Sequence, residues 1–282
     1  MKVLITGKNG DISTAISEWL KEEHGFETEQ ISLRGEKWKE NDLSAFDAVV
    51  HVAGIVPKDG VTAEDFYNIN YELTKCFANK AKNEGIKHFV YISSMAVYGA
   101  EAQISCEKGT VKSDTPCKPI SDYGKSKLLA EQSLKLIEDD NFKLTIIRAP
   151  SIYGKGKTEY LDQYKHITEK FKFIPKAFIK NYKSIIYVEN LCELIYLVIE
   201  NETTGVICPD DGQISAFDIC KAVRPDKKNS KLLGLIFNLF KNSDRIRDYY
   251  GSLCYSENLT NKFDCKYRVL DFKQAVSKSY ER

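Results

Sequence analysis

Residues 2–13, KVLITGKNGDIS, decide the fold of this 282-residue chain. A short apolar run typical of a buried strand leads without a break into Gly7 and Gly10, and a segment with helical periodicity follows. Gly7 permits a tight turn, and Gly10 lets the backbone approach a pyrophosphate, whose charge the start of the next helix would hold. Ser13 stands where a third glycine would complete the pattern, and it is small enough for close helix–strand packing. The stretch predicts a dinucleotide-binding turn, with an ordinary strand-to-helix turn as the alternative.

The rest of the first half alternates short apolar runs with amphipathic segments, which is the pattern of βαβ units. The expected strands cover residues 2–6, 26–33, 47–54, 87–94 and 143–150, and the expected helices cover 12–23, 65–85 and 123–140. Shorter helices are expected at 159–171, 189–200, 215–222 and 230–241, with short strands near 184–188 and 205–209. We therefore predict an α/β protein with a Rossmann-type, doubly wound parallel sheet over residues 1–150. A smaller, irregular α/β substrate-binding part over 151–282 is expected to interleave with it in one compact unit.

The composition argues against several classes of protein. Basic and acidic residues nearly balance, with a formal net charge of +1, so the overall charge favours neither a nucleic-acid nor an acidic-lipid partner. The eight cysteines form no C-x-x-C pair and have no histidine at metal-ligand spacing, so we expect free thiols and no metal site. The sequence starts directly on an apolar strand without signal-peptide features, which indicates a cytoplasmic protein.

The longest apolar run is LLGLIFNLF at 232–240. It is far shorter than the roughly 20 residues that cross a bilayer, so we expect no membrane span. A helix that faces the core is the expected structure, because apolar helical stripes are mostly buried. A pocket lid, a protein interface and a membrane-surface patch are the alternatives.

The end of the second strand distinguishes NAD from NADP. An acidic side chain there would accept hydrogen bonds from the ribose 2′-hydroxyl, whereas a hydroxyl and a guanidinium suit a 2′-phosphate. Ser32 and Arg34 close this strand, and no carboxylate comes before Glu36. Together with Lys8 of the glycine turn, they favour NADP(H). NAD(H) is the alternative if Arg34 is only a solvated loop residue.

Tyr123 and Lys127 stand four residues apart at the start of an expected helix, so their side chains share a face. A nearby ammonium stabilises a phenolate and lowers the pKa of a tyrosine from about 10 toward neutrality, as acid/base catalysis requires. Upstream, Ser93 and Ser94 end a buried strand. The tyrosine–lysine spacing alone is common on protein surfaces. Its combination with the serines and the glycine turn indicates a site for proton and hydride transfer.

Six ordered motifs resemble those of the extended short-chain dehydrogenase/reductase family, the NAD(P)-dependent nucleotide-sugar epimerases, dehydratases and reductases. They are TGKNGDIS (6–13), HVAG (51–54), FYNINYELT (66–74), YISSMAVYG (91–99), YGKSK (123–127) and IIRAPSIYG (146–154). The match covers about residues 2–156, with a weaker echo at 187–195. The set is specific for the family and not for one reaction.

The resemblance implies roles for individual residues. Tyr123 is implied as the catalytic acid/base, and Lys127 as the group that lowers its pKa and bonds the nicotinamide ribose. Ser94 is implied as the hydroxyl that orients the reacting sugar group, with Ser93 in support. Contacts to the cofactor are implied for Gly7, Lys8, Asn9, Gly10, Asp11, Ile12, Ser32, Arg34, Ala53, Gly54, Asn70, Tyr123, Lys127 and Pro150. Contacts to the substrate are implied for Ser94, Met95, Ser151, Tyr153, Lys183 and Ser184. For Asn70 the alternative is a helix residue bonded to nearby backbone.

Met95 and Ala96 bear on the choice of reaction. Family members that dehydrate a hexose place an Asp-Glu pair directly after the catalytic hydroxyl, and neither Met95 nor Ala96 can transfer a proton. The resemblance then favours NADPH-dependent reduction of a 4-keto-6-deoxy sugar nucleotide through Ser94, Tyr123 and Lys127. A nucleotide-sugar 4-epimerase with resident NAD is the first alternative, and a non-catalytic dinucleotide-binding regulatory module is the second. The family resemblance also implies a homodimer that pairs the helices expected at 65–85 and 123–140.

Overall fold

The computed structural model describes residues 1–103, 109–155 and 159–281, and the chain divides into two compact units. The first unit consists of Met1–Gly99, Cys117–Ala149 and Glu189–Cys208. The second consists of Ala100–Pro116, Pro150–Val188 and Pro209–Arg282. The first unit therefore includes Glu189–Cys208, although the sequence placed the domain boundary at residue 150.

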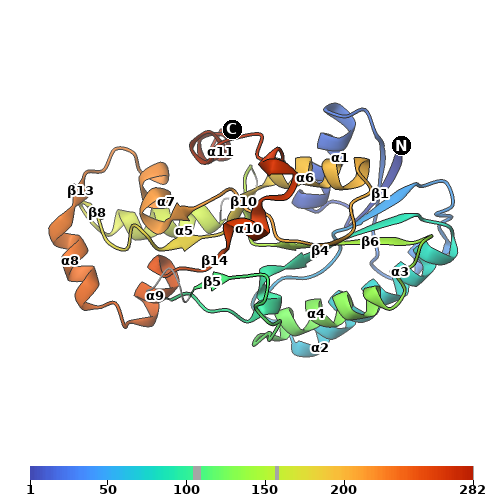
Figure 1. Cartoon of the computed structure of the whole chain (residues 1–282), viewed down its shortest axis with the longest axis horizontal. Coiled ribbons are helices and arrows are strands. Elements are labelled where there is room, and N and C mark those ends of the chain that lie inside the picture. The colour runs from blue at the N-terminus through green and yellow to red at the C-terminus, as the bar shows by residue number, and fades with distance from the viewer. Residues whose placement is uncertain (104–108, 156–158, 282) are drawn as a thin grey trace. The chain divides into compact units, whose positions relative to one another are not determined.

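The first unit is built on a six-stranded sheet in the order β2-β1-β3-β4-β6-β11, in which every neighbouring pair is parallel (Figure 1). Its strands are β1 (Lys2–Thr6), β2 (Glu27–Ile31), β3 (Ala48–His51), β4 (His88–Ser94), β6 (Lys143–Ala149) and β11 (Gly205–Ile207). The prediction of a Rossmann-type parallel sheet is confirmed. Because the strands are parallel, the turns after β1, β3 and β4 all lie at one edge of the sheet.

Helices cover both faces of this sheet, as the apolar strands require. Figure 1 shows α1 (Asp11–Glu22) and α6 (Val188–Glu200) on one face, and α3 (Leu73–Asn83) and α4 (Asp122–Lys135) on the other. The helices α1 and α6 are joined by the Trp19 indole, which donates to the Glu193 carboxylate at 2.9 Å. Beneath α3 and α4, Phe77, Phe89 and Leu134 belong to a fully buried core. Two short 3₁₀ helices, η1 (Lys37–Glu40) and η3 (Met95–Tyr98), complete the unit.

The single helix expected at 65–85 is instead three consecutive elements. They are α2 (Ala63–Phe66), the π-helical segment η2 (Tyr67–Glu72) and α3. Thr62 begins the first with a capping box, in which its side chain and that of Asp65 each bond the other's backbone N–H. Short π segments are rare and occur mostly at functional sites. The wider turn contains Asn70, one of the predicted site residues.

The second unit is the smaller, irregular α/β part expected from the sequence. Its short strands are β5 (Thr110–Val111), β7 (Ser151–Tyr153), β8 (Ile174–Pro175), β9 (Tyr182–Lys183), β10 (Ile185–Tyr187), β12 (Ile214–Ser215), β13 (Asn229–Ser230) and β14 (Cys254–Tyr255). They associate as the two-stranded pairs β10-β7, β12-β9, β13-β8 and β14-β5, and an isolated bridge joins Lys183 of β9 to Leu253. Its helices are α5 (Glu159–Glu169), α7 (Ala216–Val223), α8 (Lys231–Leu239), α9 (Asp244–Tyr250), α10 (Glu257–Thr260), η4 (Lys262–Cys265) and α11 (Phe272–Ser279). Within the described ranges, no helix is both long and apolar enough to span a membrane.

Candidate active site

The turn after β1 has the geometry that a dinucleotide-binding turn requires. Gly7 has a φ of +94°, a conformation that favours glycine. The backbone N–H groups of Gly7 and Lys8 donate to the Ile31 carbonyl at 3.0 and 3.1 Å, which ties the turn to the end of β2. The hydroxyl of Ser13 donates to the carbonyls of Gly7 and Gly10, at 2.6 and 2.8 Å. Ser13 therefore fixes the turn with its hydroxyl as well as fitting beneath it.

The start of α1 is open to an anion. Gly10 is the N-cap residue, and no side chain caps the helix there. A Cβ atom at Gly10 would lie 3.1 Å from both the Gly7 carbonyl and the Ser13 hydroxyl, so a larger residue would crowd the turn. Lys8 and Asn9 are exposed beside it. Free N–H groups at a helix start attract a pyrophosphate, so these residues fit the diphosphate of a dinucleotide.

The two residues expected to recognise the ribose 2′ position follow β2. Ser32 and Arg34 are both exposed, whereas Leu33 between them is buried. The backbone N–H of Arg34 donates to the Ser32 hydroxyl at 3.2 Å. Since Ile31 is bonded to the glycine turn, its neighbour Ser32 lies beside that turn. Selection of a 2′-phosphate by this pair stays a prediction.

A buried polar network fixes the loop after β3. The Thr6 hydroxyl accepts from the backbone N–H groups of Val52 and Ala53, at 3.1 and 3.0 Å. It also bonds Nδ1 of His51 at 3.2 Å, and Nε2 of the same ring bonds Thr74 at 3.0 Å. Burial lowers the pKa of His51 to about 3, so the ring is neutral at physiological pH. The network joins β1, β3 and α3 beneath the predicted cofactor residue Ala53.

Asn70 binds this same loop from the π segment. Its amide oxygen accepts from the Ile55 N–H at 2.8 Å, and its amide nitrogen donates to the Ile55 carbonyl at 3.0 Å and to Ser126 at 3.3 Å. A Cβ atom at Gly54 would lie 2.9 Å from the Asn70 oxygen and 3.5 Å from Nζ of Lys127. Asn70 thus links the loop after β3 to the helix that carries Lys127. Its contact with the cofactor stays a prediction.

The two serines at the end of β4 have different surroundings. Ser93 is buried, and its hydroxyl donates to the Glu131 carboxylate at 2.6 Å. Ser94 is half-buried, its hydroxyl accepts from the Ala96 N–H at 3.2 Å, and it lies close enough to the Tyr123 phenol to influence its pKa. Successive side chains of a strand point to opposite faces, which separates the two roles. Ser94 therefore points to the same side as Tyr123, and Ser93 belongs to the interior, while a role of Ser94 in catalysis stays a prediction.

Tyr123 and Lys127 lie on one face of α4, beside the end of β4. The ammonium of Lys127 is buried, donates to the Ile92 carbonyl at 2.9 Å and lies 4.9 Å from the centre of the Tyr91 ring. Burial lowers the pKa of Lys127 to about 8, and the charge of Glu131 opposes this shift. Burial raises the pKa of Tyr123, and the nearby Ser94 hydroxyl opposes that shift. The structure thus brings the three predicted catalytic residues together in the first unit.

Sequence reasoning missed the buried ion pair behind Lys127. Glu131 is one helical turn beyond Lys127, and Arg148 of β6 donates to its carboxylate at 2.6–3.2 Å. The guanidinium also donates to the Tyr98 hydroxyl at 2.8 Å. The sequence does hold a signal for this buried carboxylate. Residues four apart share a helix face, and Glu131 follows Lys127 at the same spacing at which Lys127 follows Tyr123. The ion pair of Glu131 and Arg148 anchors α4 to β6, and the Glu131 carboxylate places a negative charge near Lys127.

This order of motifs on a parallel sheet matches a known family profile. The profile described as the NAD dependent epimerase/dehydratase family matches residues 3–208. The chain belongs to that family. It is therefore an extended short-chain dehydrogenase/reductase, as its motifs predicted, with an NAD or NADP cofactor.

Curated relatives in this family include 4-epimerases. An Escherichia coli O157:H7 protein named N-acetyl-alpha-D-glucosaminyl-diphospho-ditrans,octacis-undecaprenol 4-epimerase is 29% identical over 220 residues, which cover 72% of this chain and 64% of the relative. UDP-glucose 4-epimerase of Vibrio cholerae is 27% identical over 201 residues, which cover 67% of this chain and 60% of the relative. The chain therefore matches a little under two thirds of the length of each.

Solved structures of similar fold include epimerases and reductases. UDP-glucuronic acid 4-epimerase from Bacillus cereus, in complex with NAD, has a TM-score of 0.71 at 17% identity, covering 99% of this chain and 95% of that one. dTDP-4-dehydrorhamnose reductase from Bacillus anthracis, in complex with NADP, has a TM-score of 0.61 at 22% identity, covering 81% and 82%. At 17% and 22% sequence identity, these similarities show a shared fold alone.

Met95 and Ala96 directly follow Ser94 and begin η3. Met95 is buried in η3, and the Ala96 carbonyl contacts the first turn of α4. A Cβ atom at Gly124 would lie 2.6 Å from that carbonyl oxygen, so only glycine allows this approach. The close contact between η3 and α4 places the start of α4, with Tyr123, beside the end of β4.

The other predicted substrate residues belong to the second unit, as does Pro150. Ser151 is exposed. The other three side chains are buried and hydrogen-bonded within the unit: Tyr153 to Asp211 at 2.8 Å, Lys183 to the Asp248 carbonyl at 2.6 Å, and Ser184 to Asp210 at 2.6 Å. These bonds give each of them a structural role. Their contacts with substrate stay a prediction.

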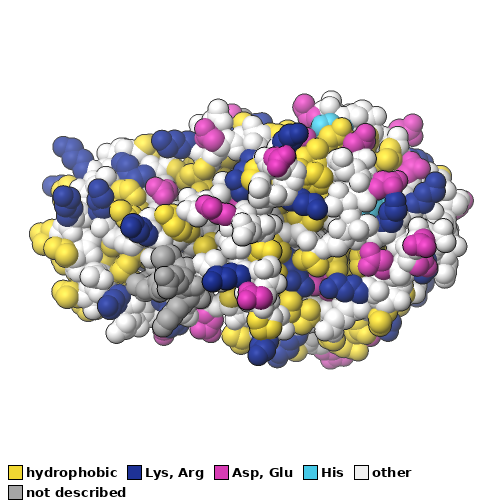
Figure 2. Space-filling view, in the orientation of Figure 1, with side chains coloured by type: hydrophobic (Ala, Val, Ile, Leu, Met, Phe, Trp, Pro, Cys, Tyr) yellow, Lys and Arg dark blue, Asp and Glu magenta, His cyan; other side chains and the backbone are white. Residues whose placement is uncertain are grey.

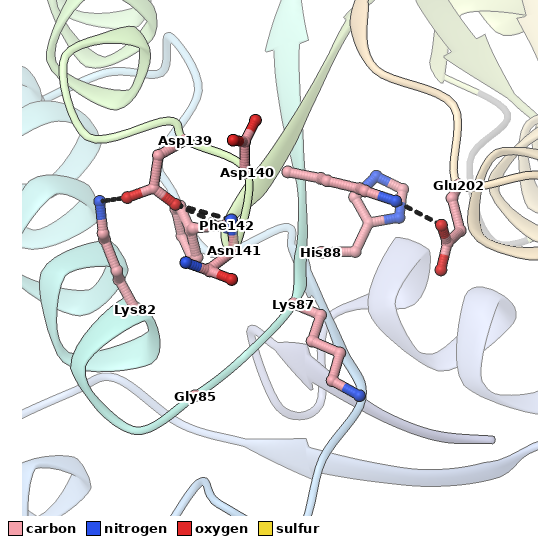
Figure 3. A pocket seen from close by; sticks show the side chains of 10 residues that line it. Lys82, Gly85, Lys87, His88, Asp139, Asp140, Asn141, Phe142 and Glu202 are labelled. Atoms are coloured by element: carbon pink, nitrogen blue, oxygen red, sulfur yellow. Dashed lines mark hydrogen bonds and ion pairs between the residues drawn. The ribbon is translucent and has the colours of Figure 1, made fainter.

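A groove of about 430 Å³ lies at the opposite edge of the sheet, where β4 and β6 begin. Figure 3 shows Lys82 bonded to Asp139, and Lys143 forms a second ion pair of the groove with Glu202. His88 lines it as well, and burial lowers the pKa of this ring to about 4. The groove is far from the carboxyl ends of the strands and has no part in the candidate site. Across the described residues, no group of three or more His, Cys, Asp and Glu side chains could hold a metal.

Proposed function

We propose that this chain catalyses hydride exchange at C4 of a sugar carried on a diphosphate. The observation that carries the proposal is the Tyr123 phenol, which lies beside Ser94 and one helical turn from the buried ammonium of Lys127. When bound, a nicotinamide dinucleotide supplies or accepts the hydride. Tyr123 passes a proton to or from the C4 oxygen, and Ser94 holds that oxygen with a hydrogen bond. Lys127 stabilises the phenolate that forms.

The environment of Lys127 supports this role. Burial alone would favour a neutral amine, which could not stabilise a phenolate. Glu131 raises the pKa of Lys127 against that effect, so that with a pKa of about 8 the ammonium is the main form at neutral pH. Arg148 compensates the Glu131 charge in turn, so α4 is not left with an unpaired buried carboxylate.

We further propose that the reaction is NADPH-dependent reduction of a 4-keto-6-deoxy sugar nucleotide. The end of β2 offers a hydroxyl and a guanidinium, Ser32 and Arg34, which suit the 2′-phosphate of NADPH. Met95 and Ala96 provide no acid and base for elimination of water, which favours a simple reduction. Hydride would reach C4 of the ketone and the proton from Tyr123 its oxygen, giving the alcohol.

Epimerisation at C4 with resident NAD is the second candidate. Two curated relatives carry this activity in their names, one on a sugar linked to an undecaprenol diphosphate and the other on UDP-glucose. The same three side chains serve this reaction, because oxidation and re-reduction at C4 both pass a proton through Tyr123. The two candidates differ in whether the cofactor is consumed.

One assay distinguishes these candidates. The purified chain is incubated with NADPH and a panel of UDP-, dTDP- and GDP-linked 4-keto-6-deoxy sugars, and in parallel with NAD and the corresponding 4-hydroxy sugars, while the absorbance of the reduced cofactor is followed. Stoichiometric oxidation with one sugar supports the reductase. Interconversion of 4-hydroxy epimers without net cofactor turnover supports the epimerase. Tight cofactor binding with neither reaction supports a non-catalytic regulatory module and contradicts the proposal.

We also propose a homodimer through the helices of the first unit. Leu129 and Leu136 lie seven residues apart along α4 and are both exposed, as is Tyr67 of η2. Exposed apolar side chains along one helical line are typical of a subunit interface. Light scattering of the purified chain tests this, and the mass of a monomer contradicts it.

A further inference from the structure

Helix α8 presents a row of apolar side chains to solvent. The sequence predicted that this segment would face the core, and only part of it does. The exposed side chains are Leu232 (70%), Leu235 (64%), Ile236 (42%), Leu239 (81%) and Phe240 (62%). They fall at positions i, i+3, i+4, i+7 and i+8, so they form one continuous helical face.

The opposite face of α8 is firmly attached to the second unit. The Ser230 hydroxyl caps the helix by accepting from the Leu233 N–H at 3.1 Å. A Cβ atom at Gly234 would lie 2.4 Å from the Lys176 carbonyl oxygen, so the helix backbone rests directly on its neighbour. The Phe237 ring packs on those of Phe171 and Tyr250, with centroids 5.5 and 5.4 Å apart. The exposed face is therefore held in place and does not result from a frayed helix.

Lysines surround this face. Segments 170–180 and 227–241 run side by side, since β8 pairs with β13 and the Lys176 N–H donates to the Ser230 carbonyl at 3.0 Å. Each segment holds four lysines and no Asp or Glu, and together these are Lys170, Lys172, Lys176, Lys180, Lys227, Lys228, Lys231 and Lys241. All are exposed except Lys227, which bonds backbone carbonyls. We call α8 with these two segments the basic apolar surface.

Among the described residues, the carboxylates that flank the two segments in the sequence pair with arginines instead of these lysines. The nearest ones along the chain are Glu169, Asp226 and Asp244, and each lies within 4.0 Å of an arginine nitrogen. Figure 2 shows hydrophobic and basic side chains together in the region of α8, with few acidic ones. The overall charge of +1 conceals this local concentration.

We propose that the basic apolar surface docks on an anionic lipid bilayer. An amphipathic helix with large aliphatic and aromatic side chains on one face, flanked by lysines, lies in the membrane interface and inserts its apolar face among the acyl chains. Lysines near the surface are attracted to anionic headgroups. A second copy of this chain is the less suitable occupant, because two such surfaces would bring their lysines together. The inference does not depend on which sugar carrier the enzyme uses.

Flotation of the full chain with lipid vesicles tests the proposal. We expect the chain to float with vesicles of phosphatidylglycerol and phosphatidylcholine in equal parts, and to remain unbound with phosphatidylcholine alone. Leu235→Glu combined with Leu239→Glu is expected to lower the vesicle affinity at least tenfold. Lys228→Glu combined with Lys231→Glu is expected to lower it by at least about tenfold as well, since each lysine contributes roughly fivefold. Val269→Glu changes an exposed apolar residue outside this surface and is expected to bind like wild type.

Three outcomes overturn the proposal. The wild-type chain fails to float with the anionic vesicles, or the two leucine substitutions leave vesicle binding unchanged. In the third, light scattering shows an oligomer that those substitutions dissociate while no vesicle binding is seen, which assigns the surface to a second copy. All substituted side chains are exposed, so the thermal unfolding midpoint should stay at the wild-type value. That measurement separates loss of docking from loss of folding.

Discussion

Replacing Gly124 by alanine tests how closely α4 must approach η3. Inside a helix, alanine is normally more stable than glycine by about 1 kcal/mol. At this position a Cβ atom would lie 2.6 Å from the Ala96 carbonyl oxygen and 3.0 Å from Pro119 Cβ, whereas ordinary contacts begin at 3.4 Å. The helix must therefore shift by several tenths of an ångström. Such overpacking costs typically 1–3 kcal/mol, so we expect Gly124→Ala to lower the free energy of unfolding by about 1 kcal/mol.

The effect on activity is expected to be larger than the effect on stability. Tyr123 precedes Gly124, so a shift of the helix start moves the Tyr123 phenol away from Ser94. A misplacement of about 1 Å can cost a hundredfold in rate, and we expect kcat to fall by about that factor. Cofactor affinity should change little, because the glycine turn after β1 is untouched.

Urea denaturation and NADPH-linked turnover measure the two effects. Lys125→Ala is the matched control, since Lys125 is the exposed next residue of the same helix, and it should keep wild-type activity. A Gly124→Ala variant that is about 1 kcal/mol more stable than wild type and fully active would refute the close contact of α4 with η3.

Three other substitutions test separate parts of the site. Glu131→Gln is expected to lower the free energy of unfolding by about 3 kcal/mol, because it removes the carboxylate that balances the buried charge of Arg148; an unchanged urea midpoint would contradict this. His51→Gln is expected to reduce the loss of stability between pH 6.5 and 3. In that window the unfolded state binds a proton at residue 51 that the folded state, with a His51 pKa of about 3, does not bind. The free energy of unfolding of the wild type therefore decreases as the pH is lowered. Identical pH profiles of unfolding for the variant and the wild type would argue against this. Arg34→Ala is expected to weaken NADPH binding at least tenfold and to leave NADH binding unchanged, as measured by fluorescence quenching; equal losses for both cofactors would exclude recognition of the 2′-phosphate.

The sheet could be predicted because its strands carry their own signal. Segment 143–149 carries apolar side chains on both faces, Leu144 and Ile146 on one and Ile147 and Ala149 on the other, which is typical of a strand covered on both sides, and the structure confirms it as β6. The spacing of Tyr123 and Lys127 likewise depends only on helix geometry, so local sequence was enough to place both on one face. These features depend on neighbours along the chain.

The remaining features depend on contacts between distant segments. Whether Glu131 is a surface carboxylate or a buried partner of Lys127 depends on Arg148, which comes from another strand. Helix α8 has apolar side chains on both faces, so periodicity could not say which face the core takes. The choice falls on the face with Gly234, because only there can the backbone near Lys176 approach the helix.

Rapid mixing of the cofactor-loaded chain with the responding sugar diphosphate tests the role of Tyr123 most directly. The absorbance of the reduced nicotinamide reports the hydride step in a single turnover, whether the reaction is a reduction or an epimerisation. We predict that Tyr123→Phe slows this step by about 10²–10⁴-fold while cofactor affinity is unchanged. A Tyr123→Phe variant that transfers hydride at the wild-type rate would show that another group moves the proton.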